Sequence, residues 1–403
     1  MFEYTLLFRE LQGSSLDSCL INQYFLYIRN DIITSLTFMF LALLSIFLLL
    51  YLIQSTLILL GVRRVRHSEH YSSEPTVTVI VAARNEEEHI GSCLDSLLNI
   101  SYPHDKLEII IVDDRSTDTT ASIIASYSQH CPFVKTFTAE QSQSHLKGKA
   151  NAVAQAIDRS SGEIILQTDA DCTVKPEWVR ETVSRYSPTT GIVGGFTLLR
   201  SDNWFGAIQA LDWIYLFTLA AAGIGWKKPL TVVGNHLTYR RKAYDDVGGY
   251  RSIKFSVTED YALVHAVEDK TRWDFNFSTS EQSLITSLPC TTANELYRQR
   301  VRWGVGGLEM KFRGLAVMAV GFILHALLLL GILLSPRMDI LLGAFLVKTL
   351  ADMIVLYRPL HTFKVDSLFR YIIHFEIYFI IYVVVLPFAV FFHHNVKWKG
   401  RTY

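Results

Sequence analysis

The apolar residues of this 403-residue chain are gathered into long blocks near its two ends, and this arrangement limits the possible fold more than any other feature. Residues 31–60 carry no charge after Asp31, whereas a helix needs only about 20 apolar residues to cross the hydrocarbon of a bilayer. The block is too long, and starts too far into the chain, for a cleaved signal peptide. We therefore expect an N-terminal segment over residues 1–30 and a transmembrane helix over residues 31–60.

A basic flank follows this block. Arg63, Arg64 and Arg66 stand directly after it in GVRRVRH. Because lysine and arginine gather on the cytoplasmic side of membrane spans, the flank predicts that the region after it lies in the cytosol. The expected localisation is an integral membrane protein with a cytosolic main domain.

Three more apolar blocks lie within residues 315–393, at 315–335, 338–357 and 371–392, and each is long enough to cross a bilayer. Three crossings would place the tail, residues 394–403, outside. Yet the tail VKWKGRTY and the loop RPLHTFK before the last block are both basic, which favours the cytosolic side. The sequence leaves open whether one block is re-entrant or interfacial, or whether the tail departs from the rule.

Between these blocks, residues 76–303 alternate short β-branched runs with helical patterns. Three runs have the pattern of buried strands: VTVIVAA (77–83), EIIIVDD (108–114) and GEIILQTDAD (162–171). The alternation predicts an α/β domain with a largely parallel sheet, which binds ligands at the carboxyl ends of its strands. Residues 204–226 are apolar and aromatic but contain Asp212, so we expect a helix at the membrane interface or in the core and not a span.

Composition narrows the kinds of partner and site. The formal net charge is +0, so no sustained basic surface is expected and a nucleic-acid partner is not predicted. The five cysteines show no CxxC pairing. They predict reduced cytosolic thiols without a zinc site or a disulfide framework.

Acidic residues follow the predicted strands. Asp169 and Asp171 form the sequence DAD after GEIILQT, and two carboxylates at a strand end can hold Mg²⁺ or Mn²⁺, whose remaining ligands are waters and substrate phosphates. Taken alone, such a pair more often caps the next helix. Asp113 and Asp114 end a neighbouring strand, where ionised carboxylates can accept hydrogen bonds from ribose hydroxyls or from a base N–H.

Two more groups of polar residues are expected at this edge. Arg84 and Glu86 follow the first strand in AARNEEEHI. Lys147 and Lys149 precede a helix expected to begin near Asn151, and lysines at a helix N-terminus favour a bound anion such as phosphate. A solvated basic turn is the alternative for these lysines.

Two motifs lie nearer the C-terminal blocks. Asp260 follows Glu259 in VTEDYAL and is the candidate general base, although an acidic pair at a helix start also interacts favourably with the helix dipole. Gln299, Arg302 and Trp303 lie in LYRQRVRWGVG, just before the first C-terminal block. Arginine can bind a leaving diphosphate in a bidentate manner and the indole can line an acceptor channel, whereas anchoring at the membrane interface is the alternative.

In this order, the motifs RNE, VDD, GKA, DAD, TED and QRVRW resemble the processive-type branch of glycosyltransferase family 2, which includes cellulose, hyaluronan and poly-N-acetylglucosamine synthases and ceramide glucosyltransferases. The resemblance covers residues 77–303 and implies a Rossmann-like GT-A fold and inverting transfer from a nucleotide-diphosphate sugar. It implies these roles: nucleotide binding for Glu86, Asp113, Asp114 and Lys149, sugar-diphosphate and metal binding for Asp169 and Asp171, base for Asp260, and closure over the diphosphate and acceptor for Gln299, Arg302 and Trp303.

The resemblance leaves two acceptor classes. Polymer synthases of this branch have more membrane segments around a channel than the one plus three expected here. The preferred expectation is therefore a metal-dependent hexosyltransferase that moves a sugar from a UDP-hexose to a hydroxyl of a membrane lipid, and the tail WKGRTY also resembles that of ceramide-type and bacterial lipid glucosyltransferases. A polysaccharide synthase stays the alternative. The sugar, the acceptor and the oligomeric state stay open.

Overall fold

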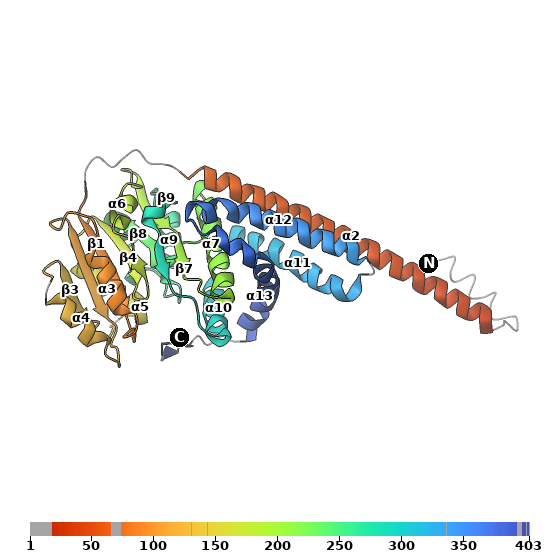
Figure 1. The fold of residues 1–403 in the computed structure, drawn as a ribbon, viewed down its shortest axis with the longest axis horizontal. Helices are drawn as coiled ribbons and strands as arrows, with labels where there is room; N and C mark the ends of the chain where they lie inside the picture. Colours follow the sequence, from red (N-terminus) through yellow and green to blue (C-terminus); the bar gives the residue numbers. More distant parts are fainter. Residues whose placement is uncertain are drawn as a thin grey trace.

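The computed structural model describes residues 18–65, 74–129, 131–142, 144–335, 337–392, 397–399 and 401–402. Figure 1 shows an α/β domain at one end of the molecule and a bundle of long helices at the other. The architecture is that of a GT-A domain joined to apolar α-helices, so the predicted fold class is confirmed.

A seven-stranded sheet, as far as the chain is described, forms the centre of the domain. Its spatial order is β3 (Val134–Thr138), β2 (Leu107–Asp113), β1 (Val77–Ala83), β4 (Ile164–Asp169), β8 (Leu237–Arg240), β6 (Thr190–Gly195) and β9 (Asp274–Ser278). The first four are parallel, and β8 runs antiparallel to both of its neighbours. Ala83 of β1 is paired with Asp113 of β2, so the carboxyl ends of these strands meet at one edge.

Helices cover both faces of this sheet. One face packs on α3 (Ile90–Leu98), α4 (Thr120–Ser128) and α6 (Trp178–Val183), and the other on α5 (Gly148–Arg159) and α7 (Trp204–Gly225). Side chains alternate along a strand, so Val79 and Val81 belong to the first core while Ile80 belongs to the second. Burial of these apolar faces stabilises the domain.

The remaining elements of the domain are short. They are a second sheet of β5 (Thr173–Val174), β10 (Ile285–Ser287) and β7 (Thr197–Leu199), the helices α8 (Arg241–Asp246), α9 (Glu259–Lys270) and α10 (Ala293–Gly307), and the 3₁₀ helices η1 (Gly234–His236), η2 (Tyr250–Ser252) and η3 (Glu281–Ser283). Of these, α9 and α10 position candidate site residues.

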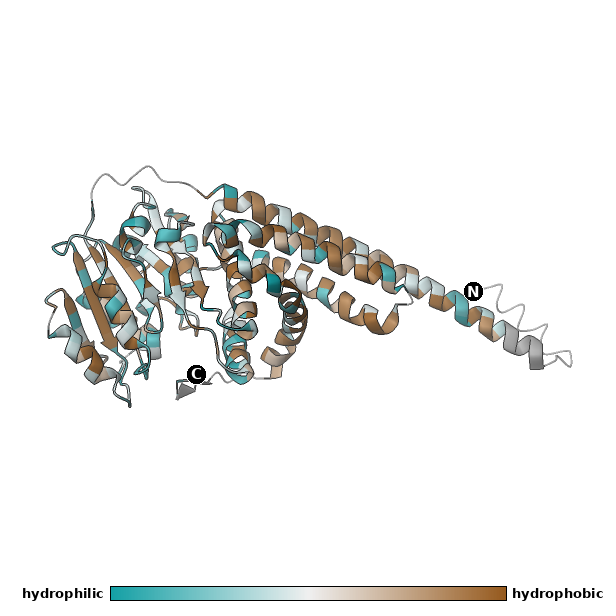
Figure 2. Ribbon diagram, viewed as in Figure 1, coloured by the Kyte–Doolittle hydropathy of each residue, from teal (hydrophilic) through white to brown (hydrophobic). Residues whose placement is uncertain are grey.

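Three long helices run side by side away from the domain: α2 (Ser18–Arg63), α11 (Phe312–Leu334) and α12 (Met338–Thr362). Figure 2 shows that most of the coloured residues in these helices are hydrophobic. α2 begins well before residue 31, where the span was expected, because residues 18–60 contain no glycine or proline to end a helix. Its last two turns pack against the C-terminal end of α7, where Nε1 of Trp226, the C-cap residue of α7, donates to the carbonyl of Leu57 at 2.8 Å.

Five described helices are long and apolar enough to cross a membrane: Tyr24–Arg63, Trp204–Gly225, Phe312–Leu334, Met338–Thr362 and Asp366–Phe392. For α7, 89% of the apolar window is buried inside the protein, against 11% for α2. α7 packs on α2, β7 and α13 (Ile372–Phe392), so it separates the sheet from the bundle. Its apolar surface is therefore used for packing within the protein.

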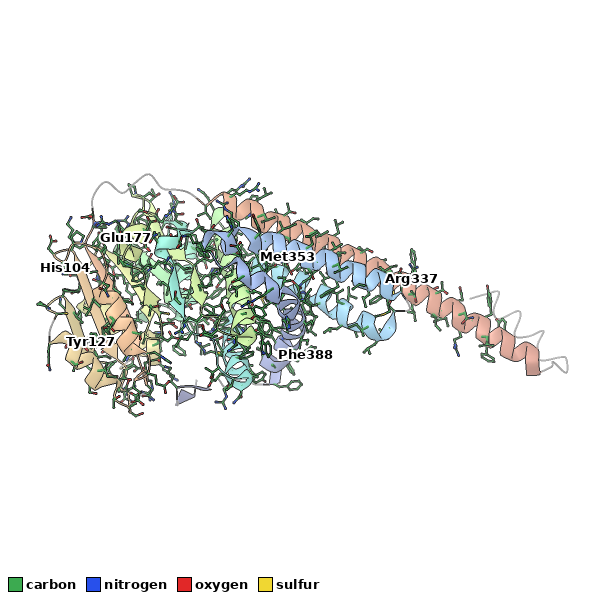
Figure 3. All side chains as sticks on the ribbon, in the orientation of Figure 1. His104, Tyr127, Glu177, Arg337, Met353 and Phe388 are labelled. Atoms are coloured by element: carbon green, nitrogen blue, oxygen red, sulfur yellow. The ribbon has the colours of Figure 1, made fainter. Side chains whose placement is uncertain are left out.

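α13 takes a different course from the other C-terminal helices. It follows η4 (Asp366–Tyr371), which packs on α7 and on the domain end of α12, and its last turns pack on α10, where Gly304 faces Leu386 and Val390. Both ends of α13 therefore lie near the domain, and Figure 1 shows the helix crosswise to α2 and α12. In contrast, Arg337, between α11 and α12, lies at the far end of the bundle (Figure 3).

Four of the five cysteine thiols are described. Cys93, Cys131, Cys172 and Cys290 are free. The side chain of Cys19 lies outside the described part of the chain.

Candidate active site

The loops after β1 and β2 are joined by hydrogen bonds. One guanidinium nitrogen of Arg84 donates to the carbonyls of Asp114 and Arg115, at 2.7 Å and 2.6 Å. The side-chain oxygen of Asn85 accepts from the backbone N–H of Thr117 at 2.9 Å. Asn85 and Arg115 have φ values of 51° and 57°, a region that non-glycine residues seldom adopt. Such strained positions persist where surrounding contacts hold them, and they cluster at functional sites.

Asp113 and Asp114 lie buried at this edge. Asp113 accepts a hydrogen bond from the backbone N–H of Ser116 at 3.1 Å, so part of its carboxylate supports its own loop. Asp114 lies beside Arg115, 3.9 Å from its Nε. The nucleotide-binding role expected for the two acids stays a prediction, while the structure shows them within the joined loops.

Asp169 is the last residue of β4, and its neighbour in space is Lys149. The Lys149 Nζ lies 2.5 Å from Asp169 Oδ1 and 3.4 Å from Glu259 Oε1. Burial lowers the pKa of Lys149, but the attraction of these carboxylates outweighs burial and the net pKa is raised. The lysine therefore stays charged and links the strand-end acids to the start of α9.

The helix that carries Lys149 begins earlier than expected. α5 starts at Gly148, about one turn before Asn151, and Gly148 has a φ of 53° that lets the chain turn into the helix. Lys149 therefore lies in the first turn, while Lys147 is exposed at the N-cap position. Only Lys149 of this pair contacts the acidic cluster in the structure.

Glu259 and Asp260 are the first two residues of α9, after Thr258 at the N-cap. Burial, followed by repulsion from Glu259, raises the pKa of Asp260 to about 6. Gly234 lies directly against this carboxylate, and a Cβ at that position would come within 3.0 Å of Asp260 Oδ2. A carboxyl group whose pKa is close to neutrality is suited to accept a proton from a hydroxyl.

Asp169 and Asp171 fit a divalent cation that also binds a substrate. Burial, followed by repulsion from Asp169, raises the pKa of Asp171, and a cation bound between the two carboxylates would oppose this shift. In the described residues, no group of three acidic, histidine or cysteine side chains could hold a metal by itself. Two carboxylates with open positions is the arrangement expected when substrate phosphates complete the coordination.

Lys399, in the C-terminal tail, is a residue of this edge that sequence reasoning did not name. Its Nζ forms an ion pair with Glu86, and its carbonyl accepts from Arg84 Nε at 3.2 Å. Burial raises the pKa of Glu86, and Lys399 opposes this shift. Because Lys399 also opposes the rise in the pKa of Asp171, its ammonium lies near both carboxylates. No local sequence pattern could have revealed a contact between residues 313 positions apart.

α10 presents the QRVRW motif in two directions. Gly306 packs on Thr258, where a Cβ would come within 2.5 Å of the threonine side chain. Gln299, Arg302 and Trp303 precede Gly306 by seven, four and three positions, so they share its face of the helix, toward the start of α9. The Gln299 Oε1 is buried there without a hydrogen-bond partner.

Another face of α10, adjacent to Trp303 and directed toward α7 and α13, holds Arg300, which sequence reasoning passed over. Its Nη2 lies 2.5 Å from Asp212 Oδ2 of α7, and its Nε donates to Tyr378 Oη of α13 at 3.2 Å. The guanidinium also lies 4.5 Å from the ring centroid of Trp303, whose other neighbour is Trp213 at 5.6 Å. An isolated acid in an apolar helix, as Asp212 is, was the signal that could have suggested such a partner.

The order of the sheet, with acids at the carboxyl ends of its strands, is that of a GT-A domain. The family model described as "Glycosyl transferase family 2" matches residues 78–260. With the relatives below, this match supports the resemblance to glycosyltransferase family 2 of the membrane-associated, processive type that the sequence motifs indicated.

Two groups of relatives match the chain. The β-monoglucosyldiacylglycerol synthase of Synechocystis sp. is 31% identical over 58% of this chain and 48% of its own length. The poly-β-1,6-N-acetyl-D-glucosamine synthase of Staphylococcus epidermidis is 29% identical over 61% of this chain and 58% of its own length. The chain therefore spans about half the length of the curated relatives it matches.

A solved structure supports the fold. The mannosyltransferase PcManGT from Pyrobaculum calidifontis, in complex with GDP-Man and Mn²⁺, superposes with a TM-score of 0.55 at 19% identity, over 88% of this chain and 99% of that one. At this identity the likeness concerns the fold alone.

Proposed function

We propose that this protein is an inverting, metal-dependent hexosyltransferase that moves a sugar from a UDP-hexose to a hydroxyl of a membrane lipid. The observation that supports this best is the continuous set of contacts from Asp169 through Lys149 to Glu259, next to Asp260. It joins an acidic pair suited to a sugar diphosphate with a carboxylate suited to act as base. The relatives named as a β-monoglucosyldiacylglycerol synthase and a poly-β-1,6-N-acetyl-D-glucosamine synthase support a sugar transfer.

In the proposed reaction, the oxygen of the acceptor hydroxyl attacks the anomeric carbon while Asp260 accepts the proton of that hydroxyl. Inversion follows because attack comes from the face opposite the leaving nucleoside diphosphate. Lys149 holds the strand-end acids in place, and Arg302 faces the same side of α10 as Trp303 and Gln299. These last three residues are proposed to close over the diphosphate and the acceptor.

Asp169 and Asp171 are the proposed metal ligands. A bound Mg²⁺ or Mn²⁺ would offset the charge that develops on the leaving diphosphate. Arg84, Glu86, Asp113 and Asp114 are proposed to bind the nucleotide, because they follow β1 and β2 at the same edge of the sheet.

Packing at the membrane end favours a lipid acceptor over a growing polymer. In the described bundle, Lys348, Asp352 and Glu376 are fully buried and Phe375 stacks on Phe379 at 5.2 Å, so packed side chains occupy its interior. At the junction with the domain, by contrast, Leu308 and Phe312 are exposed, at 66% and 84%. This exposed apolar surface beside α10 suits a lipid that reaches the site from the bilayer.

The same packing supports a cytosolic domain with the C-terminal tail on the same side. Basic residues lie at the domain ends of the long helices, namely Arg63, Lys311, Arg313 and Lys364. Since α13 returns to the domain, the basic loop before it and the basic tail after it also lie at that end. This course is compatible with the positive-inside rule for every basic segment. A tag fused after Tyr403 should be accessible to protease only from the cytosolic side.

The decisive experiment uses the purified full-length chain with labelled UDP- and GDP-sugars, Mn²⁺ and total lipid extract. We expect one UDP-hexose to yield an organic-soluble glycolipid together with free UDP. The Asp171→Ala variant should lose Mn²⁺-dependent binding of UDP, whereas Asp245→Asn, an exposed acid on α8, should behave as the wild type.

Other products would change the proposal in defined ways. A water-soluble or insoluble polymer, resistant to lipid extraction, would establish the polysaccharide synthase that one group of relatives suggests. Absence of nucleotide release with every donor would reject the transferase itself.

A further inference from the structure

The C-terminal hairpin brings a lysine to the donor edge of the site. β11 (Lys397–Trp398) and β12 (Arg401–Thr402) pair antiparallel, with Trp398 opposite Arg401, and Lys399 lies in the turn after β11. Lys399, at the tip, reaches across the chain to Glu86 and also contacts the carbonyl of Asn85, at 3.4 Å. The hairpin therefore meets the loop that follows β1.

The backbone of this turn is unusual for a lysine. Lys399 has a φ of 43°, in the left-handed region that residues other than glycine, asparagine and aspartate seldom adopt. A long cationic side chain gains nothing from this conformation itself. Its presence is explained if the ammonium group is required at the place where the turn delivers it.

The charges around Asp169 and Asp171 indicate a role for the ammonium group of Lys399. Lys149 stands on one flank, paired with Asp169 and Glu259, and Lys399 stands on the other, paired with Glu86 and close to Asp171. Lys399 is 25% exposed and Lys149 is 18% exposed, so both ammonium groups border accessible space. An anion that binds at the acidic pair through a cation meets a positive charge on each flank.

We propose that Lys399 is a donor-binding residue whose ammonium group contacts the diphosphate of the nucleotide sugar, so that the C-terminal hairpin forms one wall of the donor site. This inference rests on the proposed function. Before the donor binds, Glu86 neutralises the ammonium. When the donor binds, a phosphate oxygen competes with Glu86 for the same N–H donors, in a charge-assisted hydrogen bond. Arg84 keeps the tip in place by its bond to the carbonyl of Lys399.

The test compares binding of UDP and of uridine, which lacks the phosphates, to Lys399→Met in the full-length protein with Mn²⁺. Equilibrium dialysis measures both ligands. We expect the Kd for UDP to rise about tenfold, which corresponds to the loss of one charge-assisted hydrogen bond, while the Kd for uridine stays unchanged. Lys399→Arg keeps the charge and should restore UDP binding to within about threefold of the wild type.

A matched control removes a lysine far from the donor edge. Lys242 is exposed on α8 and pairs with Asp246, so Lys242→Met should leave both Kd values unchanged. Equal weakening of UDP and uridine in Lys399→Met would show that the hairpin only shapes the pocket, and would overturn the phosphate contact. Unchanged UDP binding in Lys399→Met would also overturn the phosphate contact. Tighter UDP binding would overturn it as well, because Lys399 would then block the site in the wild type.

The proposed function and this inference fail separately. If the wild-type protein binds neither UDP nor GDP, the transferase proposal is wrong and the inference falls with it. If the wild type prefers GDP, the same comparison is made with GDP and guanosine. If the wild type binds and transfers while Lys399→Met matches it in nucleotide affinity, only the role of Lys399 is rejected.

Discussion

Two clusters of charged side chains in this protein are built in opposite ways. At the edge of the sheet, Asp169 is 37% exposed, its neighbour Asp171 repels it, and acids outnumber the lysines around them. In the helical bundle, Lys348 pairs with Asp352 at 2.8 Å and with Glu376, and all three side chains have 0% exposure. Tyr51 Oη completes this second cluster with a hydrogen bond of 2.7 Å to Asp352.

This difference in exposure and charge balance is expected if the first cluster binds a ligand and the second only packs helices together. Uncompensated charge at an accessible edge costs stability and is retained where a ligand supplies the missing charge. A sealed cluster must instead satisfy itself, because an unpaired ion in a low-dielectric interior is expensive. We therefore propose that the first cluster binds the donor and that the second serves the packing of α12 and α13. The four predictions below challenge that assignment, beginning with the largest expected effect.

Asp260→Asn should reduce the rate of sugar transfer by about 10³-fold, because a positioned general base contributes roughly 10² to 10⁴. The binding of UDP and Mn²⁺ should stay near the wild-type level, since the amide keeps the shape of the side chain. Initial rates of glycolipid formation and equilibrium dialysis of UDP measure the two effects. Normal turnover in this variant would show that the base lies elsewhere and that the accessible cluster serves another purpose.

Lys348→Met should destabilise the folded protein by about 3–5 kcal/mol, because two carboxylates stay buried without their cation. Unfolding in mixed micelles, by titration with SDS, measures this loss. The triple variant that adds Asp352→Asn and Glu376→Gln should recover most of it. Lys364→Met is the control, since Lys364 is 75% exposed and its ion pair with Glu281 is on the surface.

A different result would give both clusters a role in function. If Lys348→Met unfolded like the wild type but transferred sugar more slowly to the lipid, the bundle cluster would belong to the acceptor site. The sealed cluster would then be functional, and the contrast between the regions would fail.

Transfer should fall as the pH drops below about 6, because burial raises the pKa of Asp260 to about 6 and only the ionised carboxylate accepts a proton. With that pKa, about one tenth of the molecules keep an ionised Asp260 at pH 5, so kcat/KM should be about tenfold below its plateau there. A pH series of initial rates tests this, with UDP affinity measured at each pH as the control. A flat profile down to pH 4.5 would contradict the assignment of Asp260 as the base.

Much of the domain was predictable because strands and amphipathic helices leave a local period in the sequence. The predicted strands at 77–83, 108–114 and 162–171 correspond to β1, β2 and β4, and the acids that follow them lie at one edge. For residues 204–226, Asp212 indicated a helix at the membrane interface or in the core, and α7 is buried between the sheet and the bundle. The choice between interface and core was not predictable, and neither was the course of α13, because only the tertiary neighbours of an apolar helix determine them.

The candidate site also contains some residues that were predictable from the sequence and some that were not. Asp169 at the end of β4 and Asp260 at the start of α9 were named from sequence, and the structure brings them near Lys149; their catalytic roles stay predictions. Lys399 and Arg300 were missed because their partners are distant in sequence and belong to other elements. Within QRVRW, Arg300 faces α13 and Arg302 faces α9. The two arginines differ only in their angular position around α10, and the sequence does not show which position faces which neighbouring helix.

Tyr378→Phe probes a third set of charges, between the two clusters, and should have the smallest effect. The Arg300–Asp212 pair survives without the hydroxyl, so we expect about 1 kcal/mol of destabilisation and about a fivefold loss in kcat/KM for the lipid acceptor, through a looser Trp303. The KM for the donor should not change. Tyr357→Phe, with 59% exposure on α12, is the control. A rise in donor KM instead would place Arg300 with the donor cluster, because only contact with the diphosphate would produce it.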